Sequence, residues 1–273
     1  MKIATVINDE LNKLLEVKTS DDFTVEAVYY RGTTLCVSSQ VGCPIRCSFC
    51  ASGKDGLYRN LSFQEIVNQY ILAKEDGLNI KNIAFAGIGE PLLNWDNVKE
   101  AFWFFKKEGL KCSFYTTGFP LDRFKELLEL PHNGINLSLH AVDEEKRKAL
   151  IPHGHPIEEI IKVLKEHLSL LSNRKKKMYN LAYLLIKDVN DSKEELDKLA
   201  SFAKDLGIGV SLLKYNEIEG FPYKSTDDKD YEEAFLYLKD KGVRVTLSNR
   251  YRTRKIGGCG TLMVNRINSS IKA

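Results

Sequence analysis

Three cysteines close together in the sequence give the strongest indication of chemistry. Cys43, Cys47 and Cys50 fall in the pattern CxxxCxxC. Three thiolates on one short loop can hold one side of an inorganic cluster, and cysteine is the usual ligand of iron–sulfur clusters. A four-iron cluster held by only three protein sulfurs keeps one iron open for a small ligand. The spacing therefore predicts an iron–sulfur centre that binds a small molecule directly.

Two other uses of these cysteines are weaker. A structural zinc site normally has four ligands, often in two separated CxxC pairs, and the chain has no second pair. A disulfide framework needs an oxidising compartment, and the N-terminal sequence MKIAT lacks the charged and apolar regions of a signal peptide. Zinc stays open as the main alternative to the cluster.

The other three cysteines differ in their surroundings. Cys36 stands at a fixed offset before the cysteine loop, and Cys259 lies within the glycine-rich stretch 257–260, a context poor for core packing. A lone cysteine in an apolar strand usually behaves as a small hydrophobic residue, which is what we expect of Cys112. Cys36 and Cys259 are therefore the candidates for thiol chemistry.

The chain must bury a core that positions these groups. It has 273 residues, of which 43% are hydrophobic, which suffices for one large domain or two modest ones, and we favour one. No run of about 18 apolar residues occurs, so we expect no transmembrane helix. We expect a monomeric, cytoplasmic protein. The formal net charge of +3 neither requires nor excludes an RNA partner.

Strand and helix patterns alternate along most of the chain. Before the cysteine loop, segments rich in Val, Thr, Tyr and Leu predict a small antiparallel meander over residues 14–20, 24–30 and 33–38. After the loop, Ser62 and Glu65 form a capping box that predicts a helix to about residue 76. The further predicted strands are 82–87, 112–116, 135–139, 179–186, 208–213 and 243–247, and the further predicted helices are 95–107, 121–130, 143–150, 157–171, 192–206 and 227–241.

This alternation predicts an α/β fold with a parallel sheet and right-handed crossovers. Counting the strand before the cysteines, the pattern contains six β/α units, and an open six-stranded barrel is their natural closure. In such architectures functional groups collect at the carboxyl ends of the strands. The cysteine loop follows the first strand, and polar or glycine-bearing clusters follow the next five, at 87–91, 115–118, 138–141, 187–190 and 214–216.

The motifs of this predicted rim occur in an order typical of one enzyme family. The stretches are CVSSQVGCPIRCSFC, GIGEPLLN, SLHA and DVNDS, followed by a late Cys-Gly pair. Over about residues 26–262 the chain resembles the RlmN/Cfr family of radical S-adenosylmethionine (SAM) enzymes, which methylate an adenine of large-subunit ribosomal RNA. The resemblance implies a partial (β/α)6 radical SAM barrel with a small N-terminal antiparallel β extension. Family members carry an N-terminal helical accessory domain, which we expect to be absent because 35 residues precede Cys36.

Three parts of the chain are expected on this basis. Residues 1–38 form the meander that leads into the first barrel strand, residues 33–247 form the partial barrel, and residues 248–273 form a C-terminal loop and tail that carry Cys259.

The resemblance also implies which residues bind the cofactors, a [4Fe-4S] cluster and SAM. Cys43, Cys47 and Cys50 match the cluster ligands. The residues that match SAM contacts are Gly89, Glu90, Ser138, Leu139, His140 and Asn216. A carboxylate at a strand end, such as Glu90, is suited to accept hydrogen bonds from an ammonium group. Tyr115 stands where the family usually has serine, so its phenol could fill ribose space or move the contact to Thr116 or Thr117.

Cys36 and Cys259 match the pair of cysteines that defines the family. In family chemistry one SAM methylates the residue matched by Cys259, and a second SAM yields a radical that removes hydrogen from the S-methyl group. The carbon then adds to the base, and the residue matched by Cys36 resolves the protein–RNA adduct by forming a disulfide. Glu26 matches the proposed proton acceptor, whereas a glutamate in a meander is otherwise expected on a solvated face.

Two basic stretches bear on the substrate. Residues 250–255, RYRTRK, place four cations and an aromatic side chain just before Cys259, as RNA backbone neutralisation and base stacking require. Residues 174–177, RKKK, are expected in a solvated loop. The resemblance implies RNA as substrate, with C2 of adenosine favoured over C8, and an electron donor such as flavodoxin or ferredoxin. The same two-cysteine chemistry on a small molecule, a nucleotide or a peptide stays open.

Overall fold

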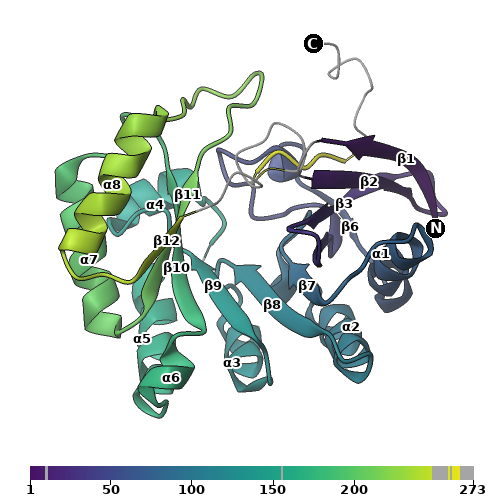
Figure 1. Ribbon diagram of the computed structural model, residues 1–273, viewed down its shortest axis with the longest axis horizontal. Coiled ribbons are helices and arrows are strands. Elements are labelled where there is room, and N and C mark those ends of the chain that lie inside the picture. The colour runs from purple at the N-terminus through teal and green to yellow at the C-terminus, as the bar shows by residue number, and fades with distance from the viewer. Residues whose placement is uncertain (10–11, 155, 248–257, 259, 265–273) are drawn as a thin grey trace.

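A ten-stranded sheet organises the described part of the chain, which in this computed structural model comprises residues 1–9, 12–154, 156–247, 258 and 260–264. The strands follow one another in the order β1-β2-β3-β4-β7-β8-β9-β10-β11-β12 (Figure 1). Their bounds are β1 Lys2–Asn8, β2 Asn12–Lys18, β3 Thr24–Tyr30, β4 Thr34–Val37, β7 Asn82–Phe85, β8 Lys111–Thr116, β9 Gly134–Ser138, β10 Tyr179–Leu185, β11 Gly209–Lys214 and β12 Val245–Leu247.

The sheet changes direction at β4. Strands β1 to β4 pair antiparallel, whereas β4 pairs parallel with β7, and every later pair through β12 is parallel. Parallel neighbours need a crossover, and helices supply it on the outer side of the curved sheet (Figure 1). The predicted partial barrel with an antiparallel extension is therefore confirmed.

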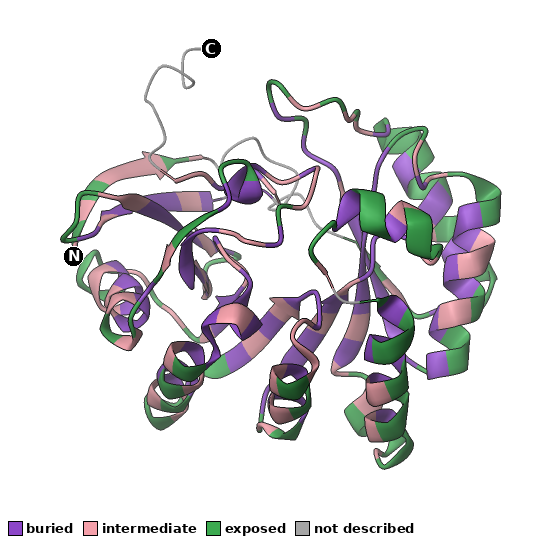
Figure 2. Ribbon diagram, turned by 180° about the vertical axis from the view of Figure 1, so that it is seen from behind, coloured by how far each residue is buried: buried purple, intermediate pink, exposed green. Residues whose placement is uncertain are grey.

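Helices cover the outer side of the parallel strands. Their bounds are α1 Phe63–Glu75, α2 Trp95–Lys107, α3 Leu121–Glu129, α4 Glu144–Leu150, α5 Ile157–Ser169, α6 Asn173–Lys176, α7 Lys193–Leu206 and α8 Asp228–Asp240. Figure 2 shows their outward faces exposed and the strands beneath them buried. No helix in the described residues is long and apolar enough to cross a lipid bilayer.

Most predicted elements occur within two residues of their expected bounds. The capping box of Ser62 and Glu65 is present at the start of α1, as predicted. β1 was not predicted, although it pairs with β2 along its whole length. The basic stretch 174–177 lies mostly in the short helix α6, so the predicted loop is wrong there, but none of the residues of α6 is buried and the predicted solvated position is confirmed.

A short hairpin that the sequence did not predict encloses the cysteine loop. It consists of β5 (Gln40–Gly42) and β6 (Leu57–Asn60), which pair antiparallel. At its neck Gly42 has a φ of +83°, and a Cβ there would lie 2.1 Å from the carbonyl oxygen of Gly56. Only glycine fits this position. The hairpin therefore brings the two ends of the cysteine loop together.

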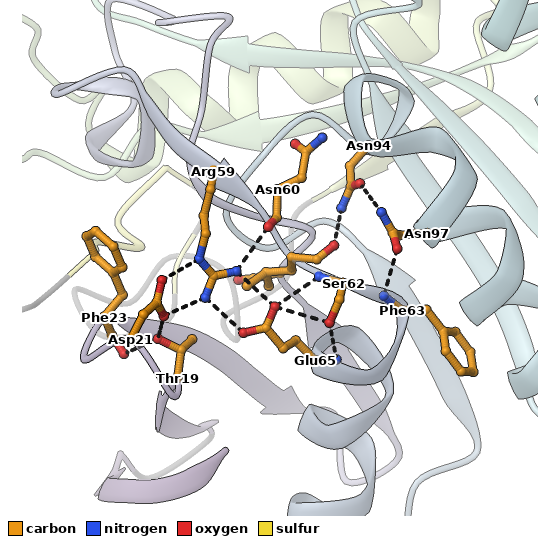
Figure 3. A network of polar contacts seen from close by, with 12 residues as sticks. Thr19, Asp21, Phe23, Arg59, Asn60, Ser62, Phe63, Glu65, Asn94 and Asn97 are labelled. Atoms are coloured by element: carbon orange, nitrogen blue, oxygen red, sulfur yellow. Dashed lines mark hydrogen bonds and ion pairs between the residues drawn. The ribbon is translucent and has the colours of Figure 1, made fainter.

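A polar network fixes this hairpin to the rest of the fold (Figure 3). The Arg59 guanidinium on β6 donates to both carboxylate oxygens of Asp21, each at 2.6 Å, and to Glu65 at 2.8 and 2.9 Å. Glu65 also accepts a hydrogen bond of 2.9 Å from the backbone N–H of Ser62, which is the N-cap residue of α1. One arginine thus joins the β2–β3 turn, the hairpin and the first helix.

Candidate active site

A cavity of about 160 Å³ lies at the carboxyl ends of the parallel strands. Five of the predicted site residues line it, namely Cys36, Cys50, Tyr115, Ser138 and His140. They come from β4, the cysteine loop, β8, β9 and the turn after β9. Four of the six predicted rim clusters, namely the cysteine loop and the clusters at 87–91, 115–118 and 138–141, therefore meet around one cavity, whereas those at 187–190 and 214–216 contribute no lining residue.

The three cysteines of the CxxxCxxC pattern are half-buried on their loop. The backbone N–H of Cys50 donates to the carbonyl of Cys47 at 3.0 Å. Burial, and then the charge of neighbouring Cys50, raises the pKa of the Cys43 thiol to about 12, and the same causes raise the pKa of Cys47 well above its usual range. Three thiolates so close together need positive charge to become stable. A metal cluster supplies that charge, so the donor set fits one.

No set of three His, Cys, Asp or Glu side chains in the described ranges is arranged around a single metal ion. The assignment of a cluster therefore depends on the three thiols of the loop and on the relatives described below.

A buried arginine that sequence reasoning missed lies beside this loop. Arg147 on α4 is 1% exposed, and its Nη2 donates to the carbonyl oxygen of Thr117 at 3.3 Å. Burial lowers the pKa of its guanidinium. The Arg147 charge acts against the rise in the pKa of Cys47, and so favours the thiolate. The sequence did offer one indication of its burial: Arg147 precedes the apolar Leu150 by three positions, so the two residues share a face of α4.

The carboxylate of Glu90 is 3% exposed and is held by four protein donors. Oε1 accepts from the Thr116 hydroxyl at 2.6 Å and the Leu92 N–H at 3.2 Å, and Oε2 accepts from the N–H and the hydroxyl of Thr117 at 2.8 and 3.0 Å. Burial raises the pKa of Glu90, and the donors from Thr116 and Thr117 oppose the rise. The threonines next to Tyr115 are therefore part of the Glu90 site.

The turn after β9 presents His140 to the cavity. His140 adopts a φ of +57°, and its Nδ1 accepts from the Leu184 N–H at 3.0 Å, which places the ring proton of the neutral histidine on Nε2. Burial, and then the Arg147 charge, lowers the pKa of His140 to about 3. The Asn190 side-chain amide donates to the His140 carbonyl at 2.7 Å. The polar DVNDS stretch thus shapes the site through Asn190, a role that the sequence did not assign.

Three other predicted residues lie near the rim but not on the cavity wall. Gly89 has a φ of +107°, and a Cβ there would lie 2.7 Å from Gln40 Cβ, so the backbone requires glycine. Leu139 is fully buried and donates its N–H to the Ala182 carbonyl at 3.0 Å. Asn216 follows β11 and is 7% exposed.

Residues near the C-terminus dock against the cysteine loop. The Ala51 N–H donates to the Gly260 carbonyl at 2.9 Å, and the Ser52 hydroxyl donates to the Leu262 carbonyl at 2.7 Å. Gly258, Gly260 and Leu262 line the same cavity as Cys36. Cys259 and the basic stretch 250–255 lie outside the described residues. Ser52 was also missed by sequence reasoning, although it stands directly after the cysteine pattern.

Glu26 takes part in this docking. Its Oε2 accepts from the Met263 N–H at 2.8 Å, and the residue is fully buried. The expectation of a solvated face for an ordinary meander glutamate is therefore wrong here. Glu26 lies on the same face of β3 as Val28 and Tyr30, because side chains two apart on a strand share a face. Both of those residues line the cavity.

Comparison with known proteins agrees with this geometry. The family model of the radical SAM superfamily matches residues 37–203. The chain belongs to that superfamily. It is 34% identical over 262 residues to the probable dual-specificity RNA methyltransferase RlmN of Dictyoglomus thermophilum, covering 91% of this chain and 74% of that protein. The RlmN homologue of Petrotoga mobilis is 33% identical, with 98% and 80% covered.

Solved structures give the same result. A radical SAM methyltransferase from Sphaerobacter thermophilus superposes with a TM-score of 0.85 at 27% identity, covering 96% of this chain and 80% of the other. SuiB of Streptococcus suis bound to SAM has a TM-score of 0.58 at 17% identity, covering 78% and 49%, and shows the fold alone.

Within the superfamily, the chain belongs to the RlmN family of methyltransferases. It is therefore a radical SAM methyltransferase, and its cofactors are a [4Fe-4S] cluster and SAM.

Proposed function

We propose that the chain methylates an aromatic carbon of adenosine in RNA, at C2 in preference to C8, by way of a methyl group carried on Cys259. The observation that carries this proposal is the composition of one cavity wall. Cys36, the cluster-loop residue Cys50, and both neighbours of position 259 line the same small cavity. The family name shared by the relatives supports RNA as the substrate class.

The bound cofactors would supply the methyl group and the one-electron chemistry that activates it. Cys43, Cys47 and Cys50 would hold the cluster. Glu90 would receive the ammonium group of SAM, because the hydroxyl protons of Thr116 and Thr117 can rotate away from its carboxylate. Gly89, Ser138, Leu139, His140 and Asn216 would complete the SAM site. Tyr115 lines the cavity and would limit the space beside the ribose.

The chain's own groups would then complete the reaction. Glu26 would accept the proton lost from the base carbon. The Cys36 thiolate would attack the sulfur of Cys259 and form an S–S bond. The bond from that sulfur to the methylene carbon on the base would break, and that carbon would leave with the bonding electron pair and take up a proton to become the methyl group. Cys36 is half-buried on the cavity wall, which keeps its thiol accessible to a partner within the cavity.

The proposed partners follow from this chemistry. The RNA would dock through the basic stretch 250–255, whose cations neutralise phosphates. A low-potential electron donor such as flavodoxin or ferredoxin would reduce the cluster.

The test is the Cys36→Ala variant, produced without oxygen and compared with Cys259→Ala. Cys36→Ala should accumulate a covalent protein–RNA adduct, because nothing resolves it, and Cys259→Ala should form none. Cys112→Ala is the matched control, since Cys112 is a fully buried core residue that does not line the cavity. Adducts would be detected as nuclease-sensitive bands, and digests analysed for 2-methyladenosine and 8-methyladenosine. Release of free methylated product by Cys36→Ala would overturn the resolving role.

A further inference from the structure

A fixed positive charge is buried next to the loop of the three cysteines. Arg147 on α4 is 1% exposed, and a guanidinium keeps its proton across the pH range in which proteins are folded. Burying a charge is unfavourable unless groups of opposite charge or hydrogen-bonding partners compensate for it. The negative groups around Arg147 are therefore expected to gain stability from its charge.

Backbone contacts hold the last turn of α4 against the cysteine loop. The N–H of Ser48, which directly follows Cys47, donates to the carbonyl of Leu150 at 3.0 Å, and Leu150 is the last residue of α4. In the turn after this helix, a Cβ on Gly154 would lie 3.5 Å from Arg147 Nη1, so the turn packs against the guanidinium. The guanidinium is therefore enclosed on the side of the loop.

On another side the guanidinium contacts the proposed SAM site. Its Nη2 donates to the carbonyl oxygen of Thr117 at 3.3 Å. The N–H and the hydroxyl of Thr117 donate to Glu90 Oε2 at 2.8 and 3.0 Å. Thr117 thus links Arg147 to the carboxylate that is proposed to receive the SAM ammonium group. The proposed sites of both cofactors therefore adjoin this one side chain.

The charge of Arg147 acts on a residue from each of these sites. Burial is the main cause of the raised pKa of Cys47 and of the pKa of His140 being lowered to about 3, and in both residues the Arg147 charge favours the form with less positive charge. The charge of Cys47 acts in turn on the guanidinium, after that of Glu144. Salt screens buried charges much less than exposed ones, so these interactions persist in solution.

We propose that Arg147 raises the reduction potential of the [4Fe-4S] cluster and so helps the cluster to accept the electron that SAM cleavage requires. In this step one electron passes from a low-potential reductant to the cluster, and no bond of Arg147 forms or breaks. The cluster gains one negative charge, and a buried cation stabilises the reduced cluster more than the oxidised one. The inference depends on the proposal that Cys47 is a cluster ligand.

The experiment is a redox titration of the whole protein, reconstituted with iron and sulfide and kept free of oxygen. Dithionite and mediator dyes set the potential, and electron paramagnetic resonance measures the fraction of reduced cluster. Arg147→Met removes the charge and keeps an unbranched side chain, whereas Arg147→Lys keeps the charge. A nearby charge changes the ionisation equilibrium of a group by about tenfold or more.

The two variants should therefore differ in midpoint potential. Arg147→Met should lower the equilibrium constant for reduction about tenfold or more, which for one electron is about 59 mV or more. Arg147→Lys should stay close to the unaltered protein. The matched control is Lys148→Met, which removes an exposed charge from the next position of the same helix and should leave the midpoint unchanged. Equal midpoints in Arg147→Met and Arg147→Lys would overturn the proposal, as would an equal shift in Lys148→Met.

Iron and sulfide analysis covers the case in which Arg147→Met does not retain the cluster. A role for the charge then requires that Arg147→Lys retains it, and loss of the cluster from both variants would overturn the proposal in favour of a purely structural role. Cys47→Ala tests the ligand assignment separately. Unchanged cluster content in Cys47→Ala would contradict that assignment and the present proposal with it, whereas equal midpoints would contradict only the role of Arg147.

Discussion

The hydrogen bond from Ser52 to Leu262 gives the sharpest test of how the C-terminal residues are held over the cavity. The change is Ser52→Ala, which removes a buried donor 2.7 Å from the Leu262 carbonyl and leaves that oxygen without this partner. A neutral hydrogen bond contributes about 1 kcal/mol net, and an unsatisfied buried acceptor costs about 1–3 kcal/mol. We therefore expect residues 260–264 to open more readily by about 1–3 kcal/mol.

Local opening of this size is measurable by hydrogen exchange. Since about 1.4 kcal/mol is a factor of ten, exchange of the Met263 amide should accelerate about 5- to 140-fold in Ser52→Ala. Hydrogen exchange with mass spectrometry on the peptide that contains Met263 would report it, with unfolding by urea measured separately to exclude a global effect.

The matched control for this prediction is Ser48→Ala. Ser48 lies on the same loop, but its hydroxyl shares a hydrogen bond of 2.7 Å with the Tyr223 hydroxyl and lies 3.5 Å from the Leu150 carbonyl, and it has no recorded bond to residues 258 or 260–264. Equal acceleration in both variants, or none in Ser52→Ala, would show that the Ser52 contact does not hold these residues.

Two further predictions concern buried titratable groups. Glu26→Gln should keep an acceptor for the Met263 N–H, and so keep that amide protected from exchange, but it should lose product formation because the proton acceptor is gone. Glu26→Leu should lose both the protection of the amide and the product. A wild-type product yield from Glu26→Gln would argue against proton acceptance by Glu26. Burial lowers the pKa of His132 from 6.5 to about 4. Between these two values the unfolded state binds more protons than the folded state, so the free energy of unfolding falls as the pH drops from above 6.5 towards 4. Between about pH 7 and about pH 5 His132 should account for about 2 kcal/mol of the lost unfolding free energy. The unfolding free energy measured in urea should depend less steeply on pH in His132→Gln than in the unaltered protein. An unchanged dependence in this variant would contradict the assignment.

The fold was largely predictable because the spacing of apolar residues and the positions of turn residues agree along the barrel. The helix over Trp95–Lys107 and the strand ending at Thr116 were predicted to within a residue, since apolar spacing and turn residues mark both. β5 and β6 were missed because strands of three and four residues show too few alternations to detect. Their pairing depends on Gly42, whose role appears only when Gly56 approaches it.

The site was predictable to the extent that local motifs define it. The cysteine pattern and the rim positions of Tyr115, Ser138 and His140 followed from order along the chain, because parallel strands end at one edge. Contacts between distant segments left no such signal. Nothing near Glu26 or Ser52 in the sequence indicates that they bond Met263 and Leu262, and nothing near Glu90 indicates that two threonines from the next strand hold its carboxylate.

The bond between Ser52 and Leu262 joins residues 210 positions apart, which affects how the enzyme matures during synthesis. A growing chain can assemble its sheet as the strands leave the ribosome in order, since neighbouring strands are mostly consecutive in sequence. The wall that includes Gly258, Gly260 and Leu262 can be added only after these residues have been synthesised, which is later than all ten strands of the sheet. Until then the cysteine loop remains uncovered on that side, which leaves a period in which iron and sulfide can reach it before the pocket closes.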